Sequence, residues 1–438
     1  MTNSSPAVSR VEATEAKPNS GGLLGTSLLA VSIASAATMQ GAFSTVQEAA
    51  KADLNLTDFD LGIVQGLAVA IPIAVLSVPL GRMVDRTNRI RLMIVMSVLW
   101  TAGTLATAFA PNMPLLFLAR MLTGLGSTCA VIAAISIAAD LCRPAQRGRA
   151  MMILTLGKNA GAAAAFALGG WLFGVFLAQD MFGMLPWRSV HIALAGLSAV
   201  LTLALLLVKE PQRQETQPGA DMAFASVMKV LWDRRVFLIP LFAGQISGTM
   251  ADAAAAIWAA PVLSRNFGLS PEQFAGWMGG VMLLSGVGGA VIGGLSADAG
   301  HKSRIRGGIL LGAVIASGLA APAAIFPLMP TALGFGVALT VLLLGGTVTG
   351  LVTATAISVL LPNEVRGLCL GLFLAVAGII AFGIAPSLVT AVSGIMGGDQ
   401  HLAPALALVG TAVSIVSFLT FLLAMRNAPE RAAAKPIG

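Results

Sequence analysis

Twelve apolar runs dominate the sequence, each close to the ~20 residues that an α-helix needs to cross a lipid bilayer. Only 10% of the 438 residues are charged, whereas a soluble protein carries about 25%. We therefore expect an all-α membrane protein with twelve transmembrane helices. The predicted spans are 23–49, 60–81, 92–110, 115–141, 150–175, 190–208, 236–260, 273–296, 307–329, 332–361, 367–393 and 403–425.

The basic residues are concentrated in alternate connections between the predicted spans. The tails and the connections near 82–91, 143–149, 209–235, 302–306 and 366 hold 21 of the 26 Lys and Arg residues. The opposite connections hold three, Lys51, Arg188 and Arg265. Because basic loops stay on the cytoplasmic side, we expect a multi-pass inner (plasma) membrane protein with both termini in the cytoplasm. The net charge of +7 is then explained by orientation, and we expect no nucleic-acid partner.

One loop pattern occurs twice, after the second and after the eighth predicted span. The residues are Gly81, Asp85, Arg86 and Arg89 in the first copy, and Gly294 and Asp298 in the second. Both the glycine and the aspartate are displaced by 213 residues, which indicates two six-helix halves with a substrate site between them at the midplane. The predicted organisation is a disordered cytoplasmic tail 1–22, a bundle 23–208, a cytoplasmic linker 209–235, a bundle 236–425 and a cytoplasmic tail 426–438.

These motifs resemble those of the major facilitator superfamily of secondary transporters. The first loop copy is similar to the loop that follows the second span in that family, and Arg120-Met121-Leu122-Thr123-Gly124 is similar to its membrane arginine motif. Gly157, Gly161 and Gly169-Gly170 resemble the glycine motif of its antiporters, with Ala162 in place of the usual proline. The resemblance implies two pseudo-symmetric bundles that rock around a central site. It also implies that the loop residues brace neighbouring helices.

A finer resemblance is to spinster-like members, a branch that includes lipid exporters. The residues that carry it are Leu56 with Leu61-Gly62, Val78-Pro79-Leu80-Gly81-Arg82, Asn88-Arg89, Trp187-Arg188 and Val208-Lys209-Glu210-Pro211. It implies a lipid-like amphiphile as substrate. The acidic–basic pair that such proteins often carry in the first span is missing here, where the sequence reads Ala37-Thr38-Met39-Gln40-Gly41.

Three ionisable residues stand out inside the predicted spans: Arg120, Lys158 and Asp252. Each costs ~2.5–3.5 kcal/mol on insertion scales unless it is paired or hydrated, so each is a candidate functional residue. We expect Arg120 and Lys158 to attract an anionic group. We expect Asp252 to pair with one of them in one conformation and to take a proton in the other. The alternatives are a static ion pair, local helix bracing by Arg120, or a Lys158 side chain that reaches the interface.

Other polar residues are candidates for smaller roles. Gln40, Asn159 and Gln245 lie in spans and either line the cavity or make ordinary interhelical hydrogen bonds. We expect Asp140 and Arg143, at the inner end of the fourth span, to brace a gate. The two loop aspartates, Asp85 and Asp298, are expected to act as structural locks.

Enzymatic and cofactor-based functions find little support in the sequence. The three histidines, His191, His301 and His401, are too dispersed for a metal cluster, and no catalytic residues can be assembled. No nucleotide-binding glycine loop with a following Lys-Ser/Thr occurs. Cys129, Cys142 and Cys369 are expected to be buried free thiols. We therefore expect no metal and no cofactor. A membrane enzyme or a non-transporting receptor would instead have cavities without solute flux.

The sequence thus predicts a monomeric secondary transporter. We expect it to move a small organic anion or an anionic amphiphile, with energy from protons. The alternative is proton-driven efflux of hydrophobic or cationic drugs, in which Asp252 meets the cation.

Overall fold

The computed structural model describes residues 21–142, 147–180, 183–208, 210–211, 231–303, 305–361, 369, 373 and 376–429. All the regular structure in these ranges is helical. The first half contains α1 (Gly21–Leu54), α2 (Asp58–Gln65), α3 (Leu67–Arg86), α4 (Arg89–Phe109), α5 (Met113–Leu141), α6 (Arg147–Ala178), α7 (Pro186–Ala204) and η2 (Leu205–Leu207). The second half contains α9 (Arg235–Phe267), α10 (Pro271–Lys302), η3 (Gly308–Leu310), α11 (Leu311–Ala323), η4 (Phe326–Leu328), α12 (Ala332–Leu360), η5 (Gly378–Ile384), α14 (Ala385–Met396), η6 (Asp399–His401) and α15 (Leu402–Arg426).

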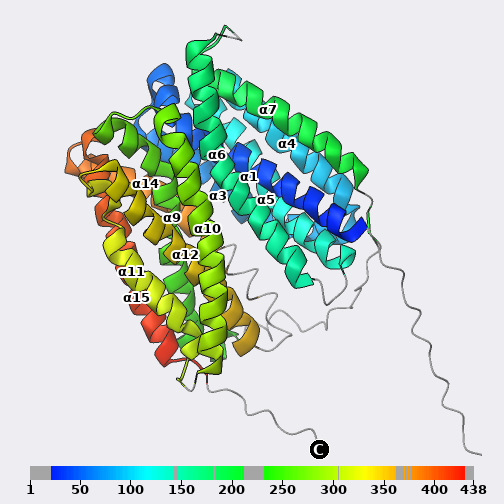
Figure 1. Cartoon of the computed structure of the whole chain (residues 1–438), viewed down its shortest axis with the longest axis vertical. Helices are drawn as coiled ribbons and strands as arrows, with labels where there is room; N and C mark the ends of the chain where they lie inside the picture. The colour runs from blue at the N-terminus through cyan, green and yellow to red at the C-terminus, as the bar shows by residue number, and fades with distance from the viewer. Residues whose placement is uncertain are drawn as a thin grey trace, which may run out of the picture.

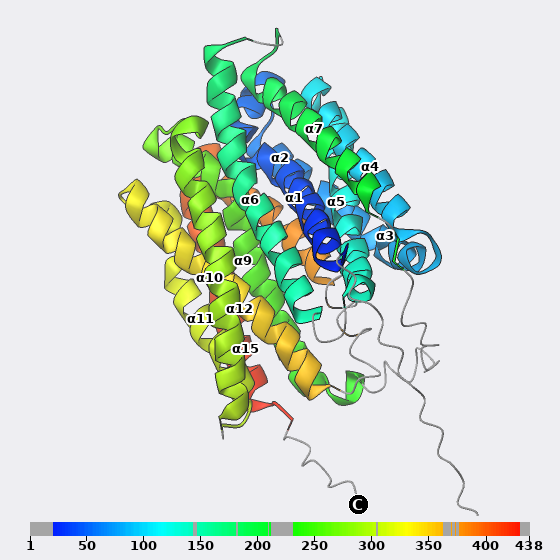
Figure 2. The same cartoon turned by 45° about the vertical axis from the view of Figure 1, so that its right-hand side comes forward.

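The helices form two bundles, one from each half of the chain (Figure 1). Twelve helical segments of the described chain are long and apolar enough to cross a membrane, which confirms the predicted fold class. Helix α6 of the first bundle and α10 of the second lie side by side in both views (Figures 1 and 2). Most of the predicted cytoplasmic linker 209–235 lies outside the described residues.

Two predicted spans are less regular than their apolar patterns suggest. The second span is divided into α2 and α3 at Gly66, where a Cβ atom would lie 2.7 Å from the Phe382 carbonyl oxygen. The eleventh contains the π-helical η5, which continues as α14. These two irregular segments meet across the boundary between the bundles, so backbone approaches backbone there, which only glycine permits.

Several helices begin at polar residues whose side chains satisfy free backbone N–H groups. Thr57 and Asp60 form a capping box at the start of α2. Asn88 accepts from the Arg91 N–H at 2.8 Å at the start of α4, and Asn112 caps α5 in the same way. The helix ends of the described part of the chain lie on two opposite faces of the molecule (Figure 1). We call the face that carries Leu54 and Phe267 the closed end, and the other the opposite end.

Glycines create close helix contacts both within and between the bundles. A Cβ atom at Gly161 of α6 would overlap the Ala34 carbonyl oxygen of α1, in the same bundle. A Cβ atom at Gly170, further along α6, would instead overlap Ala275 of α10, in the other bundle. Helix α6 therefore packs on its own bundle along one face and on the partner bundle along another.

Within the described ranges, buried apolar residues of both bundles pack together at one end and not at the other. One core contains Phe43, Val46 and Leu61 from the first bundle together with Trp258 and Val389 from the second. The two remaining cores each draw on a single bundle. One extends through Val84, Ile90 and Cys142, and the other through Ile309, Ile357 and Leu361. The bundles are thus joined at the closed end and have separate cores toward the opposite end, where their long axes diverge (Figure 1).

Candidate functional site

The three ionisable residues predicted inside spans lie on three different helices. Arg120 is on α5, Lys158 on α6 and Asp252 on α9. Among the described residues they form no ion pair with one another. Their surroundings differ.

Arg120 is enclosed in the first bundle, with 2% of its surface exposed. Its guanidinium donates to the Met39 carbonyl oxygen at 3.2 Å and to the Gln40 carbonyl oxygen. It also lies 5.3 Å from the centre of the Phe43 ring. The charge is therefore stabilised by α1 carbonyl dipoles and an aromatic face, and in this conformation Arg120 ties α5 to α1.

Lys158 is exposed and lies on a different face of α6 from the contacts that the helix makes with its neighbours. Gly157 and Gly161 pack on α1, and Asn159 packs on Gly286 of α10. Trp171, with 61% of its surface exposed, marks the outer face of α6. Helical geometry separates it from Lys158 by about 140° around the axis. The Lys158 amine therefore belongs to the face between the two bundles. Of the two cations among the three residues, Arg120 is buried and Lys158 is accessible.

Asp252 lies inside the second bundle against α12. A Cβ atom at Gly346 would overlap the Asp252 carboxylate, so the carboxylate occupies the space that glycine leaves. Its Oδ1 atom is buried and has no hydrogen-bond partner. Asp252 thus stands apart from both Arg120 and Lys158 in this conformation.

The three uncharged candidates all lie at helix contacts. Gln40 accepts a hydrogen bond from Ser127 at 2.7 Å, within the first bundle. Gln245 accepts from Thr353 of α12 at 3.2 Å, within the second. Asn159 alone of these reaches across to the other bundle, where it packs on Gly286.

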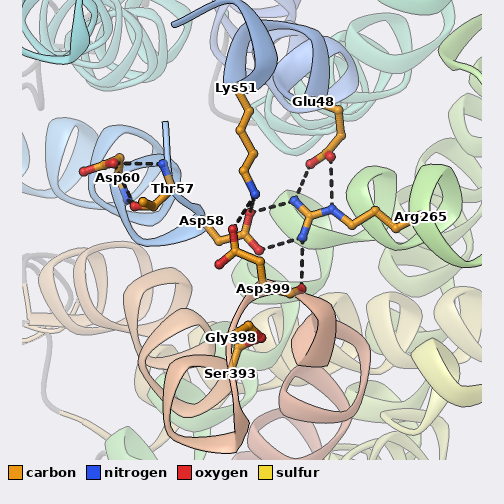
Figure 3. Close-up of polar contacts among 9 residues, drawn as sticks. All are labelled: Glu48, Lys51, Thr57, Asp58, Asp60, Arg265, Ser393, Gly398 and Asp399. Atoms are coloured by element: carbon orange, nitrogen blue, oxygen red, sulfur yellow. Dashed lines mark hydrogen bonds and ion pairs between the residues drawn. The ribbon is translucent and has the colours of Figure 1, made fainter. Parts of the chain in front are cut away.

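At the closed end, five charged residues join the two bundles (Figure 3). Arg265 of α9 donates to Glu48 of α1 at 2.6 and 3.0 Å, and to both oxygens of Asp58 of α2 at 2.6 Å. Lys51 of α1 donates to Asp58 at 2.6 Å and to Asp399 of η6 at 2.5 Å. Asp58 is the centre of this closed-end network and is 1% exposed. Its charge is balanced by a cation from each bundle.

This network was not anticipated from the sequence, where Lys51 and Arg265 appear only as scattered basic residues of the outer connections. Glu48 and Arg265 are 217 positions apart, and no sequence spacing indicates that they meet. The one available signal was the density of acidic residues around Lys51, namely Glu48, Asp53 and Asp58.

At the opposite end, the predicted gate residues Arg89 and Asp140 are in contact. Arg89 is 2% exposed and donates to Asp140 of α5 at 2.5 Å, to Glu210 at 2.8 Å and to the Ser136 hydroxyl at 3.1 Å. Glu210 also accepts from the Ile90 N–H at 2.9 Å, at the start of α4. This cluster, which we call the Arg89 cluster, joins α4, α5 and the segment after η2, all on the side of the first bundle.

The remaining gate candidates lie in α3, in α10 or outside the described residues. Gly81 and Asp85 lie in α3, but the Asp85 side chain is outside the described part of the structure, as is Arg143 altogether. Arg86 is exposed at the end of α3. Gly294 and Asp298 lie in α10, and Asp298 is exposed with no ion pair among the described residues. Within the described ranges, no group of three or more His, Cys, Asp or Glu side chains could hold a metal ion.

Comparisons with known proteins place these features in a family context. The family model for the Major Facilitator Superfamily matches residues 28–386. An uncharacterized transporter, YgaY, from Escherichia coli O157:H7 is 27% identical over 192 residues, which are 43% of this chain and 43% of that protein. A multidrug resistance protein B homolog from Mycobacterium tuberculosis (strain CDC 1551 / Oshkosh) is 28% identical, over 44% of this chain and 32% of its own. These matches cover less than half of each relative.

The fold is similar to that of solved transporters. A bacterial homologue of the human lysosomal transporter Spinster, in an inward-facing and unoccupied conformation, superposes with a TM-score of 0.79 at 18% identity. The match covers 94% of this chain and 98% of that one. The nucleoside transporter NupG (D323A mutant) superposes with a TM-score of 0.72 at 13% identity, over 92% of this chain and 99% of that one.

Proposed function

Since the chain belongs to the Major Facilitator Superfamily and is a transporter rather than an enzyme, we propose that it moves a small organic anion or an anionic amphiphile. We further propose that transport is coupled to protons and occurs across the inner (plasma) membrane. The protein would act as a monomer, with both termini in the cytoplasm and with residues 23–208 and 236–425 as its two moving halves.

The observation that carries this proposal is the difference between the two ends of the molecule. The bundles share a core and an ionic network at the closed end, and have separate cores toward the opposite end. With the basic connections in the cytoplasm, the closed end faces outward and the described conformation is open to the cytoplasm. Transport then requires the closed-end network to separate while the bundles meet at the opposite end.

An anionic substrate group is favoured by the cations of the first bundle. Lys158 is accessible on the face between the bundles, and Arg120 lies in the neighbouring helix α5. In this conformation Arg120 is held by α1 carbonyls, so we propose that Lys158 makes the first contact with the substrate. Similarity to the Spinster homologue, which concerns the fold alone, is compatible with an amphiphilic substrate.

Asp252 is the residue that we propose for proton exchange. It is the one acidic residue of these three candidates, and it forms no ion pair with any cation in the described part of the chain. Rocking of the second bundle would change the surroundings of Asp252. A change of surroundings changes how readily the carboxylate takes a proton, and this couples protonation to alternating access.

A second candidate function is efflux of hydrophobic or cationic drugs. The observation in its favour is similarity over 44% of the chain to a protein named as a multidrug resistance protein homolog. In that case Asp252 would meet the cation, and Lys158 and Arg120 would not be needed for substrate binding.

A double variant, Arg120→Gln with Lys158→Gln, separates the two functions. We would first screen the purified protein for anionic metabolites, lysolipids and cationic drugs that raise its melting temperature. Transport of each stabilising compound would then be measured in proteoliposomes. Loss of anion or lysolipid transport in the double variant supports the proposal. Stabilisation by cationic drugs alone, retained in the double variant and lost in Asp252→Asn, supports drug efflux. The control replaces two exposed cations, Arg235→Gln with Lys302→Gln.

A further inference from the structure

A small polar pocket lies within the second bundle around Asp252. It is formed by α9, α11, α12 and α15, and its polar lining consists of Asp252, Ser317, Thr349, Ser414 and Ser417. Its volume of about 10 Å³ is room for about one particle of the size of a water molecule. All four helices contribute from the middle of their spans, so the pocket is at the depth where transporters of this kind bind ions.

Three of the four hydroxyl groups present only lone pairs to the pocket. Ser317, Thr349 and Ser417 donate to backbone carbonyl oxygens at 2.7, 2.9 and 2.7 Å, respectively. A hydroxyl has one hydrogen and two lone pairs. Because that hydrogen is already in use in each case, these three side chains can only accept from, or coordinate, whatever occupies the pocket.

In the described part of the chain, each of the other two polar side chains has an oxygen atom without a hydrogen-bond partner. Asp252 Oδ1 and Ser414 Oγ are buried without a hydrogen bond, and Ser414 is 1% exposed. An ionised carboxylate can only accept. The pocket therefore collects oxygen acceptors from five side chains, against one available hydrogen, that of Ser414. Buried acceptors that lack a donor are costly.

Oxygen atoms in excess of donors are the coordination sphere of a hard cation. A single carboxylate balances one positive charge, whereas a divalent ion is normally held by more acidic groups. The pocket volume leaves no room for a hydration shell. We propose that this pocket binds one dehydrated monovalent cation of the sodium class, coordinated by Asp252, Ser414 and the lone pairs of the neighbouring hydroxyls.

The inference deepens the proposed function, because it rests on Asp252 as the coupling residue and adds a second ion to the proton. A proton on Asp252 and a sodium ion in the pocket are mutually exclusive, since both use the same carboxylate. We therefore expect sodium to need a higher concentration for half-maximal binding as pH is lowered. The rival occupant is a water molecule, which would donate to Asp252 and one hydroxyl and would respond to no salt.

The test is sodium-dependent thermal stability of the purified full-length protein in detergent. Sodium chloride is exchanged for choline chloride at constant ionic strength, so that only the identity of the cation changes. A cation that binds the folded state raises the melting temperature with a saturable dependence on concentration. We expect a rise of several degrees in the wild type, none in Asp252→Asn, and a several-fold higher half-saturating concentration in Ser414→Ala. Asp180→Asn removes an exposed acid and should behave as wild type.

Equilibrium dialysis with radioactive sodium provides a second measurement that does not depend on how stable each variant is. Binding near one ion per chain, weakened several-fold in Ser414→Ala, supports the pocket. No binding, or equal shifts with sodium and choline, overturns it in favour of a trapped water. Sodium binding without any transport of anions or drugs would refute the proposed function and leave the site standing. Transport that requires Lys158, in a protein that binds no sodium, would support the proposed function and refute the sodium site.

Discussion

Ionic contacts cross between the bundles at the closed end and stay on one side at the opposite end. Arg265 of α9 binds Glu48 and Asp58 of the first bundle, and Lys51 reaches Asp399 of the second. Arg89 is as thoroughly paired, with Asp140 and Glu210, but both partners belong to the first half of the chain. Among the described residues, no ion pair joins the bundles at the opposite end.

The difference indicates what each cluster stabilises. Contacts between rigid bodies exist in one conformation and are lost in another, so their energy determines how the two conformations are populated. Contacts within a rigid body persist through the cycle, so their energy contributes to the stability of the fold. We therefore expect variants of the closed-end network to change access, and variants of the Arg89 cluster to change melting temperature.

The largest effect on access is expected from Arg265→Gln. It leaves the buried Asp58 with Lys51 alone and removes both contacts to Glu48. Loss of one partner of a buried pair costs about 3 kcal/mol or more, which is about 100-fold in the equilibrium between conformations. A thiol at position 390 reports on this equilibrium, because Thr390 is 5% exposed and packs against Gly62 of the first bundle. Maleimide labelling of Thr390→Cys should accelerate strongly in Arg265→Gln.

The control for this variant is Arg188→Gln, at the same end. Arg188 binds Asp53 at 2.7 Å, and both residues belong to the first bundle. Labelling at position 390 should stay at the wild-type rate. Equal acceleration in both variants would mean that general loosening, and not loss of a contact between the bundles, exposes the thiol. The native cysteines Cys129, Cys142 and Cys369 are buried and give a low background.

The second effect is on stability and concerns Arg89→Gln. This change removes the contacts of Arg89 with Asp140 and Glu210, but these acids retain 12% and 24% exposure, so water replaces part of what is lost. We expect a loss of about 2 kcal/mol in the stability of the fold, seen as a lower melting temperature in detergent. Labelling of Thr390→Cys at low temperature should be unchanged. A large change in labelling without a lower melting temperature would contradict the comparison.

The sequence was a good guide to elements and a poor guide to partners. The apolar runs predicted twelve spans, because lipid solvation acts on each segment separately, and the loop pattern repeated 213 residues apart predicted two bundles. The break at Gly66 was missed, because it depends on backbone of the distant segment Phe382–Gly383. Arg89 and Asp140 were both proposed as gate residues, and they are in contact. The pairing of Arg265 with Asp58 was not foreseen, since it depends on how two bundles dock.

Two glycines of one helix extend the comparison from charges to packing. Gly161→Ala would force a methyl group against the Ala34 carbonyl within the first bundle, and Gly170→Ala would force one against Ala275 of the second. Overpacking of this kind costs roughly 1–3 kcal/mol. We expect Gly161→Ala to lower the melting temperature with little change in labelling at position 390. Gly170→Ala should accelerate labelling with a smaller loss in melting temperature. The same phenotype for both would show that α6 does not move relative to α10 as a rigid part of its bundle.

The smallest effect is expected at the exposed edge of the closed-end network. Asp399 is 48% exposed and contacts Lys51, which keeps its bond to Asp58 when Asp399 is changed. Exposed pairs contribute about 0.2–1 kcal/mol, so Asp399→Asn should accelerate labelling at position 390 by only about two-fold. High salt screens exposed charges over a few ångströms, so this difference should vanish at about 1 M salt while the effect of Arg265→Gln persists. If Asp399→Asn matched Arg265→Gln at all salt concentrations, the buried Asp58 would not be the centre of the contact between the bundles.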